Sequence, residues 1–272
     1  MSILRPEDPV DLSTGHDARH DDPPLPPENM SGHTKKLRFI LDHLRRHIRH
    51  HGAPVNLLDF GCGNGAAVSR FLMIDGVRYH GVDIHEPSLA HARRHFGGDH
   101  TVFLDDVPAD QAFDVLVYAD IIEHLDEPVA VLKQHAAALE PDGVLIGSVP
   151  NGFGPFENEK RLDRWLKISA ILDLPARIRR NTGNAPPPNP AAVPYNAESG
   201  HVQFFTRESL RSTLDRAGYR LCTFLNGAFL GAPLSERYLF RGESIAQWNA
   251  RVADRLPHWA VSTWLFTAEK KR

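Results

Sequence analysis

Three alternating glycines, Gly61, Gly63 and Gly65, follow an apolar run that ends with Asp59 and Phe60. A strand that enters a glycine-rich turn and continues into a helix brings backbone N–H groups close to a bound nucleotide. Glycine suits such a turn because it adopts positive φ and places no Cβ between the backbone and a ligand. The pattern predicts a nucleotide-binding loop, with the Asp59 carboxylate at the C-terminal end of the strand.

Two classes of cofactor fit this loop. Gly61, Gly63 and Ala66 satisfy the dinucleotide fingerprint G-x-G-x-x-G/A, and Asp83 lies 22 residues after Gly61, near the position of the ribose acid in NAD-binding enzymes. A carboxylate suits ribose because it only accepts hydrogen bonds and can accept from two neighbouring hydroxyls. From these residues alone, an NAD(P)-dependent oxidoreductase remains open.

The elements that position these residues alternate between residues 55 and 149. Strands are predicted at 55–60, 78–83, 101–104, 113–118 and 144–149. Helices are expected over 66–73, from Pro87 to Phe96, and after Asp126, which we interpret as an N-cap. Residues 141–143 (Pro-Asp-Gly) are predicted to form a turn. Strands that alternate with helices predict a parallel sheet covered on both faces.

Further elements flank this region. Apolar residues recur at helical spacing over 33–50, which predicts an amphipathic helix. Thr206 is expected to cap a helix that ends at Gly218, followed by a strand at 219–225. A helix that ends at Pro257 and a final strand at 258–268 complete the prediction.

The helix predicted over 33–50 carries histidines four residues apart, His43, His47 and His51. Such pairs can bind a metal ion, but no neighbouring carboxylate or cysteine in the sequence completes a set of ligands. We therefore interpret them as part of a solvated polar face.

Composition narrows the functional classes. The chain has 272 residues and a net charge of -3, so no global basic field favours nucleic acid as a partner. Its two cysteines, Cys62 and Cys222, are too few for a disulfide framework and favour a cytoplasmic protein with reduced thiols. We find neither a secretory signal nor an apolar run long enough to span a membrane.

Three segments depart from a minimal domain. Residues 1–32 are rich in Pro, Asp and His and are predicted to form a flexible N-terminal arm, while 33–272 form the main domain. Residues 151–200 are an insertion expected to form a lid over an acceptor, and 227–258 are a second insertion. The helix expected over 158–174 is basic and amphipathic. Such a helix can contact a membrane surface, hold an anionic acceptor or pack as an ordinary cap.

Several motifs occur together in order. They are Asp59-x-Gly61-x-Gly63-x-Gly65, the run FDVLVYADIIEHLDEP from Phe113, LEPDGVLIGSVPN from Leu139, and GHVQFFTRESLRSTLDRAGY from Gly200. Together they resemble class I S-adenosylmethionine (SAM) dependent methyltransferases of the methyltransferase 11/12 type, related to the small-molecule O-methyltransferases of ubiquinone biosynthesis. The resemblance covers roughly 55–150 and 200–226.

The resemblance implies a fold and a cofactor. The fold is an α/β, Rossmann-like sheet of seven strands with helices on both faces and a lid insertion, whose last strand inserts antiparallel between its neighbours. The cofactor is SAM, with Asp83 on the ribose and Asp105 on the adenine amine. The implied cofactor-binding residues are Asp59, Gly61, Cys62, Gly63, Asn64, Gly65, Asp83, Ile84, Asp105, Asp106, Val107, Tyr118, Ala119 and Asp120.

The expected reaction is methyl transfer to an oxygen of a small-molecule, sugar or lipid-linked acceptor. Histidine has a suitable ordinary pKa for removing the acceptor proton, so we expect His201 to be the base, with His124 and Glu123 beside it. The same residues, with Asp120, could instead hold a divalent ion, although we expect no metal. A SAM-binding protein without catalysis is a further alternative, and a homodimer stays open.

Overall fold

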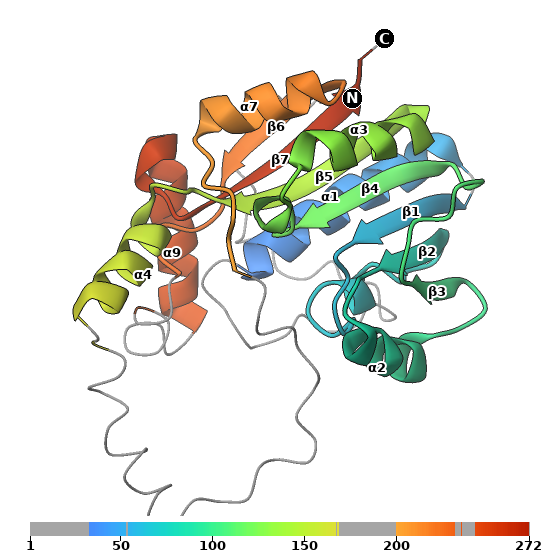
Figure 1. Ribbon diagram of the computed structural model, residues 1–272, viewed down its shortest axis with the longest axis horizontal. Helices are drawn as coiled ribbons and strands as arrows, with labels where there is room; N and C mark the ends of the chain where they lie inside the picture. The colour runs from blue at the N-terminus through green and yellow to red at the C-terminus, as the bar shows by residue number, and fades with distance from the viewer. Residues whose placement is uncertain are drawn as a thin grey trace, which may run out of the picture.

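The computed structural model describes residues 33–52, 54–166, 168, 200–231, 235 and 243–271. Seven strands form one sheet in the order β3-β2-β1-β4-β5-β7-β6 (Figure 1). Their bounds are β1 Val55–Phe60, β2 Val77–Val82, β3 Thr101–Leu104, β4 Phe113–Ala119, β5 Leu139–Pro150, β6 Tyr219–Asn226 and β7 Thr263–Lys270. The first five strands are parallel, and β7 runs antiparallel to both β5 and β6. This confirms the expected fold and the expected place of the last strand.

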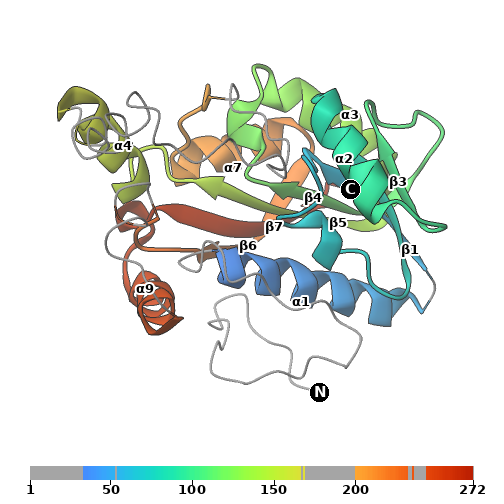
Figure 2. The ribbon, with the colours of Figure 1, turned by 90° about the horizontal axis from the view of Figure 1, so that it is seen from below.

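Helices cover both faces of the sheet. Their bounds are α1 His33–His51, α2 Glu86–Phe96, α3 Pro128–Ala138, α4 Pro155–Leu166, α7 Arg207–Arg216 and α9 Glu243–Arg255. One core cluster joins apolar residues of α1 and α2 to the sheet, and a second cluster joins those of α3 and α7. Figure 2 shows α1 on one side of the sheet and α7 on the other. The apolar stripe of α1 explains this packing, because Leu37, Ile40 and Leu44 are fully buried.

The carboxyl ends of the parallel strands meet at one edge of the sheet. In Figure 1, α4 and α9 lie beyond that edge, as does the N-terminal end of α1. Ligands of open α/β sheets bind outside this edge. Helix α4 belongs to the predicted lid at 151–200, and α9 belongs to the second insertion at 227–258. Most of the predicted lid, part of the second insertion and the N-terminal arm at 1–32 lie outside the described residues, so these domain assignments stay predictions.

Two local predictions are wrong. Over 66–73 the structure has turns and a short 3-10 helix, η1 (Ser69–Phe71), instead of an α-helix. The Ser69 hydroxyl donates a hydrogen bond to the buried Asp59, which holds the segment against the strand. Residues 141–143 lie inside β5, not in a turn, where the register with β4 shifts between Phe113 and Val115.

Three smaller differences concern helix and strand ends. Glu127, not Asp126, is the N-cap of α3, and no side chain caps that helix. The final strand begins at Thr263, after a short 3-10 helix η3 (His258–Ala260). Lys35 is buried against Asp254 of α9, although its sequence position places it off the apolar stripe. By contrast, Thr206 caps α7 as expected, through a capping box with Ser209.

Candidate active site

The glycine loop follows β1 and has the backbone geometry that its sequence predicts. Gly61, Gly63 and Gly65 have φ values of 80°, 56° and 80°. A Cβ on Gly61 would lie 2.6 Å from Ile121, and one on Gly65 would lie 2.8 Å from Phe96. A Cβ on Gly63 would meet nothing within 4 Å. The first and third glycines therefore allow close packing, whereas the second leaves open space above the loop.

Asp83 lies directly after β2 and faces this loop. Its Oδ2 accepts a hydrogen bond from the Gly63 N–H at 2.8 Å, and its Oδ1 accepts one from the His85 N–H at 2.8 Å. Each carboxylate oxygen keeps a second lone pair, which suits a pair of ribose hydroxyls. The next residue, Ile84, is 87% exposed, an apolar side chain held beside the acid.

Asp59, in contrast, is turned away from solvent. It is 2% exposed, and its Oδ2 accepts hydrogen bonds from the Ser69 and Tyr79 hydroxyls, each at 2.7 Å. Burial raises its pKa to about 6, partly opposed by these two donors. The carboxylate thus supports the loop from beneath. The neighbouring Cys62 thiol is also buried, and burial raises its pKa.

The other predicted cofactor-binding residues with polar side chains lie in the glycine loop and in the turn after β3. Asn64 accepts a hydrogen bond from the Ala66 N–H through Oδ1 at 3.0 Å, which shapes the glycine loop. After β3, Asp105 and Asp106 are exposed, and the Val107 N–H donates to Asp106 at 2.8 Å. The Asp105 carboxylate is therefore accessible to a ligand at the same edge of the sheet.

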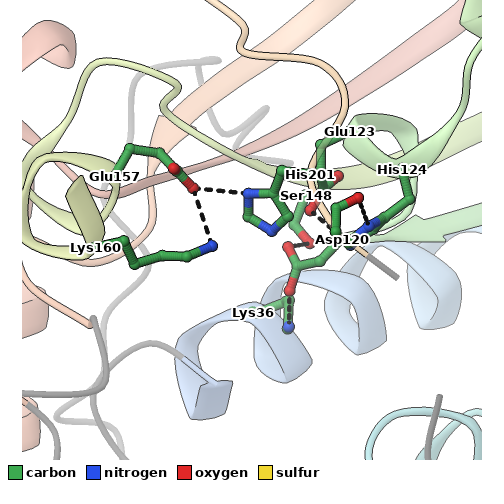
Figure 3. A network of polar contacts seen from close by, with 9 residues as sticks. Lys36, Asp120, Glu123, His124, Ser148, Glu157, Lys160 and His201 are labelled. Carbon is green, nitrogen blue, oxygen red and sulfur yellow. Dashed lines mark hydrogen bonds and ion pairs between the residues drawn. The ribbon is translucent and has the colours of Figure 1, made fainter. Parts of the chain in front are cut away.

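Tyr118 and Asp120, at the end of β4, differ in how their side chains are placed. The Tyr118 side chain is fully buried and bonded to His135, so only its backbone can approach a ligand. Ala119 ends the strand and Asp120 follows with a φ of 56°, which is strained for a residue with a Cβ. Asp120 accepts from Ser148 of β5 and from Lys36 of α1, each at 2.5 Å (Figure 3). Burial acts to raise the pKa of Asp120. The Lys36 ammonium acts in the opposite direction, and the net result is a pKa below the usual value.

A second polar cluster lies next to Asp120. Figure 3 shows His201 between Glu157 of α4 on one side and Glu123 and His124 on the other. His201 Nδ1 lies 2.7 Å from Glu157 Oε1, and the rings of His124 and His201 are 4.9 Å apart. One ligand atom from each of Glu123, His124 and His201 lies within 4.8 Å of the others. The structure therefore brings together all three residues that the sequence predicted to be catalytic.

The chain near Glu123 explains this closeness. Its backbone carbonyl accepts from the Val202 and Gln203 N–H groups, both at 2.9 Å, which joins the segment after His201 to η2 (Ile122–His124). The Gly200 carbonyl lies 3.0 Å from His124 Nδ1, so this ring nitrogen carries the proton. Two segments distant in sequence are thereby fixed beside each other.

Two groups of this cluster, the Glu123 carboxyl and the His201 imidazole, have shifted pKa values. Burial raises the pKa of Glu123 well above its usual value, and the Asp120 carboxylate adds to the effect. Its Oε2 has no hydrogen-bond partner in the described part of the chain. Burial and the Lys160 ammonium lower the pKa of His201, although Glu157 acts in the opposite direction. At neutral pH His201 is therefore uncharged.

Sequence reasoning missed three members of this site. Lys36, Ser148 and Glu157 were not among the residues that the sequence predicted for the site. No local signal marks them, because each is defined by a partner between 28 and 84 residues away.

Comparison with known proteins decides the cofactor. A methyltransferase domain model matches residues 31–223, most of the chain. The chain belongs to this methyltransferase family. Its sheet order and glycine loop make it a class I SAM-dependent methyltransferase with SAM as cofactor, and the NAD(P)-dependent alternative falls away. The residues described above fit SAM, because Gly63 leaves space above the loop and Asp83 presents free acceptors beside it.

Relatives of this methyltransferase are distant. It is 36% identical over 103 residues to the ubiquinone biosynthesis O-methyltransferase of Idiomarina loihiensis, a match to 35% of this chain and 42% of the relative. The chain thus spans less than half the length of this curated relative.

Two solved structures share the fold. A SAM-dependent methyltransferase of Clostridium acetobutylicum is 11% identical, with 88% of this chain and 92% of that chain covered and a TM-score of 0.50. Magnesium protoporphyrin IX methyltransferase of Synechocystis, solved with bound S-adenosylhomocysteine, is 14% identical over 88% of this chain and 84% of that chain, also with a TM-score of 0.50. Within the described part of this methyltransferase, no helix combines the length and apolarity needed to cross a membrane.

Proposed function

We propose that this methyltransferase transfers the SAM methyl group to an oxygen of a small-molecule, sugar or lipid-linked acceptor, with His201 as the general base. The observation that carries the proposal is the contact of 2.7 Å between His201 Nδ1 and Glu157 Oε1. A carboxylate only accepts, so His201 carries its proton on Nδ1 and keeps the lone pair on Nε2. That nitrogen is then the one that takes a proton from an acceptor hydroxyl.

When bound, SAM supplies an electrophilic methyl group on its sulfonium, and this chain's residues must orient and deprotonate the acceptor. The lowered pKa of His201 keeps the imidazole neutral at physiological pH and therefore ready to accept a proton. The proton that it gains is stabilised by Glu157, which faces Nδ1. This arrangement follows the logic of a base oriented by a third group.

Glu123 has a complementary part in the proposal. Burial raises its pKa well above the usual value and so favours the protonated carboxyl group, which can donate a hydrogen bond where an ionised acid could only accept. With Oε2 unpartnered in the described residues and 1% of the residue exposed, the group is held in place for a specific contact. His124 lies beside it, with Nε2 at 4.0 Å from Glu123 Oε1.

Oxygen as the acceptor atom is supported by the curated relatives, which are O-methyltransferases of ubiquinone biosynthesis. The acceptor itself would be defined by α4, α9 and the predicted lid. A cytoplasmic location, a homodimer and contact with a membrane surface through α4 also remain predictions.

A specific observation supports one variation on this chemistry. Glu123, His124 and His201 offer a carboxylate and two imidazoles close together, a donor set that suits a divalent cation. A cation held there would lower the pKa of an acceptor hydroxyl. In that case the activity would be lost on dialysis against a chelator and restored by added metal, whereas a base mechanism would be unaffected.

The test uses labelled SAM and a panel of phenols, catechols and sugars, with the product methyl group assigned by carbon NMR. We expect an O-methyl product and a rate that His201→Gln and His201→Asn both reduce by about 100-fold, the lower range for general base catalysis. Asn retains a donor near Nδ1, and Gln places an amide near Nε2, so loss in both identifies the imidazole. Transfer only to amines, or wild-type rates in both variants, would overturn the proposal.

A further inference from the structure

A second group of metal-ligating side chains lies at the opposite end of α1 from the active site. His47 and His51 belong to the last turns of α1, and Asp114 is the second residue of β4. One ligand atom from each of the three lies within 4.8 Å of the others. The C-terminal end of α1 and the start of β4 lie at the amino edge of the parallel strands (Figures 1 and 2), so the group is at that edge, whereas the cofactor loop after β1 and the cluster with His201 lie at the carboxyl edge.

His47 has an unmet hydrogen-bonding requirement. Its Nε2 is shielded from solvent and has no hydrogen-bond partner among the described residues. A shielded polar atom without a partner costs free energy unless something else binds it. The rings of His47 and His51 are stacked with centroids 4.1 Å apart, and one nitrogen of each lies within 4.8 Å of the other.

Asp114 supplies the carboxylate. Its Oδ2 accepts a hydrogen bond from the Asn56 N–H at 2.7 Å, which fixes the side chain and leaves Oδ1 for another partner. Asp142 lies near enough to act electrostatically on His47. The carbonyl end of α1 adds a partial negative charge. These features together make the site attractive to a cation.

We propose that His47, His51 and Asp114 bind a divalent transition-metal ion, with Zn²⁺ as the best match. Two imidazoles and one carboxylate are a common ligand set for zinc, with water in the fourth position. Zinc bonds of about 2.0–2.2 Å place tetrahedral ligand atoms roughly 3.4 Å apart, so the three atoms must close in slightly. His51 is exposed, which leaves its side chain free to adjust.

The ion would join the end of α1 to the start of β4. The first turns of α1 carry Lys36, which contacts Asp120 at the active site. The proposed metal is therefore a structural clip that holds a helix whose other end reaches the catalytic region. The spacing of His47 and His51 is compatible with metal binding, but the carboxylate that completes the set could not be predicted, because Asp114 lies 63 residues after His51.

The test uses the full chain, first dialysed against a chelator. We expect Zn²⁺ titrated by calorimetry to bind with micromolar affinity, and Co²⁺ to give the visible absorption of a tetrahedral site. We also expect Zn²⁺ to raise the melting temperature, since binding to the native state stabilises it. His47→Ala and Asp114→Asn should each lose one equivalent of bound metal and the shift in melting temperature.

Two controls separate this site from other histidines. His50→Ala removes an exposed histidine of the same helix turn that is not in the group, and His201→Asn removes a ligand atom from the cluster at the active site. Both should retain the equivalent that His47→Ala loses. The proposal would be overturned if the wild-type chain bound no Zn²⁺ at 100-fold molar excess. Equal binding by wild type and His47→Ala, or equal losses in His50→Ala and His47→Ala, would also overturn it. Circular dichroism of the metal-free variants checks that each is folded.

Discussion

The Gly63 N–H donates a hydrogen bond of 2.8 Å to Asp83 Oδ2, so the glycine loop and the acid after β2 hold one another in place. This contact places the carboxylate beside the space that Gly63 leaves open. The acid is therefore positioned by the same loop that is expected to carry the cofactor.

Replacing Asp83 by Ala should weaken the binding of S-adenosylhomocysteine by about 30- to 1000-fold. That range corresponds to about 2–4 kcal/mol for the loss of two hydrogen bonds to a charged group. Calorimetric titration measures it. Glu86→Ala is the matched control, because Glu86 is an exposed acid three residues later whose partner is Arg93 on the surface. An affinity of Asp83→Ala within threefold of wild type would show that Asp83 does not bind the ribose.

The second and third glycines of the loop should respond differently to Ala. Gly65→Ala places a Cβ 2.8 Å from Phe96 at a φ of 80°, so we expect a fall in melting temperature. Gly63→Ala meets no neighbouring atom and should cost the fold only about 1 kcal/mol of backbone strain. Its methyl group enters the open space instead, so the affinity for S-adenosylhomocysteine should fall more than stability. Equal effects of the two variants on both quantities would contradict this assignment.

The pH dependence of turnover should report His201. A base must be neutral, so the rate should rise with pH through its pKa and level off above it. Burial and Lys160 lower that pKa, which places the midpoint below the ordinary histidine value of 6.5. Steady-state rates between pH 4.5 and 8 at saturating SAM measure the midpoint.

Two variants should move this midpoint in opposite directions. Glu157→Gln removes a charge that raises the pKa, so the midpoint should shift to lower pH and the rate should also fall. Lys160→Met removes a charge that lowers the pKa, so the midpoint should shift to higher pH. Shifts of the same sign, or none, would show that another group controls the profile.

Asp59→Asn should make stability less sensitive to pH. Burial raises the Asp59 pKa from 3.8 to about 6, so between these values the native chain binds more protons than the unfolded chain. The contribution of Asp59 to stability is therefore greatest below pH 3.8 and falls as pH rises to about 6. Asn cannot ionise, and it can still accept from Ser69 and Tyr79.

We expect Asp59→Asn to be more stable than wild type at pH 7.5, by up to about 3 kcal/mol on the scale of 1.36 kcal/mol per pKa unit. The difference should disappear near pH 4. Urea unfolding at both pH values measures it, with the exposed Asp106→Asn as control. A variant that is destabilised at pH 7.5 would show that the ionised carboxylate supports the loop.

Local patterns predicted most of the fold. The apolar runs of β1 and β4, the glycines with positive φ and the Thr206 cap all depend on neighbours in sequence, and the structure has them as expected. The predicted helix at 66–73 and turn at 141–143 fail because distant partners decide them. Ser69 is held by Asp59, and a Cβ on Gly143 would lie 3.0 Å from the Asp114 carbonyl of the neighbouring strand.

The site also has residues that local sequence could predict and residues that it could not. Asp83 and the glycine loop could be predicted, because a strand end and a turn fix them locally. His201, His124 and Glu123 do lie close together, as their places near strand ends predicted, while their catalytic roles stay predictions and their partners could not be predicted. Glu157 is 44 residues from His201, and Lys36 is 84 residues from Asp120. Such pairs depend on how helices dock, which hydrophobic periodicity does not encode.

The antiparallel β7 has a consequence for synthesis of the chain on the ribosome. Among the described strands, β6 pairs with β7 alone, and β5 pairs with β7 on the side away from β4. When Asn226 leaves the ribosomal exit tunnel, Thr263 has not yet emerged, and β6 lacks its partner β7. During that interval β5 presents an unpaired edge that could join another nascent chain. Completion of this side of the sheet therefore waits for the last strand of the chain to emerge.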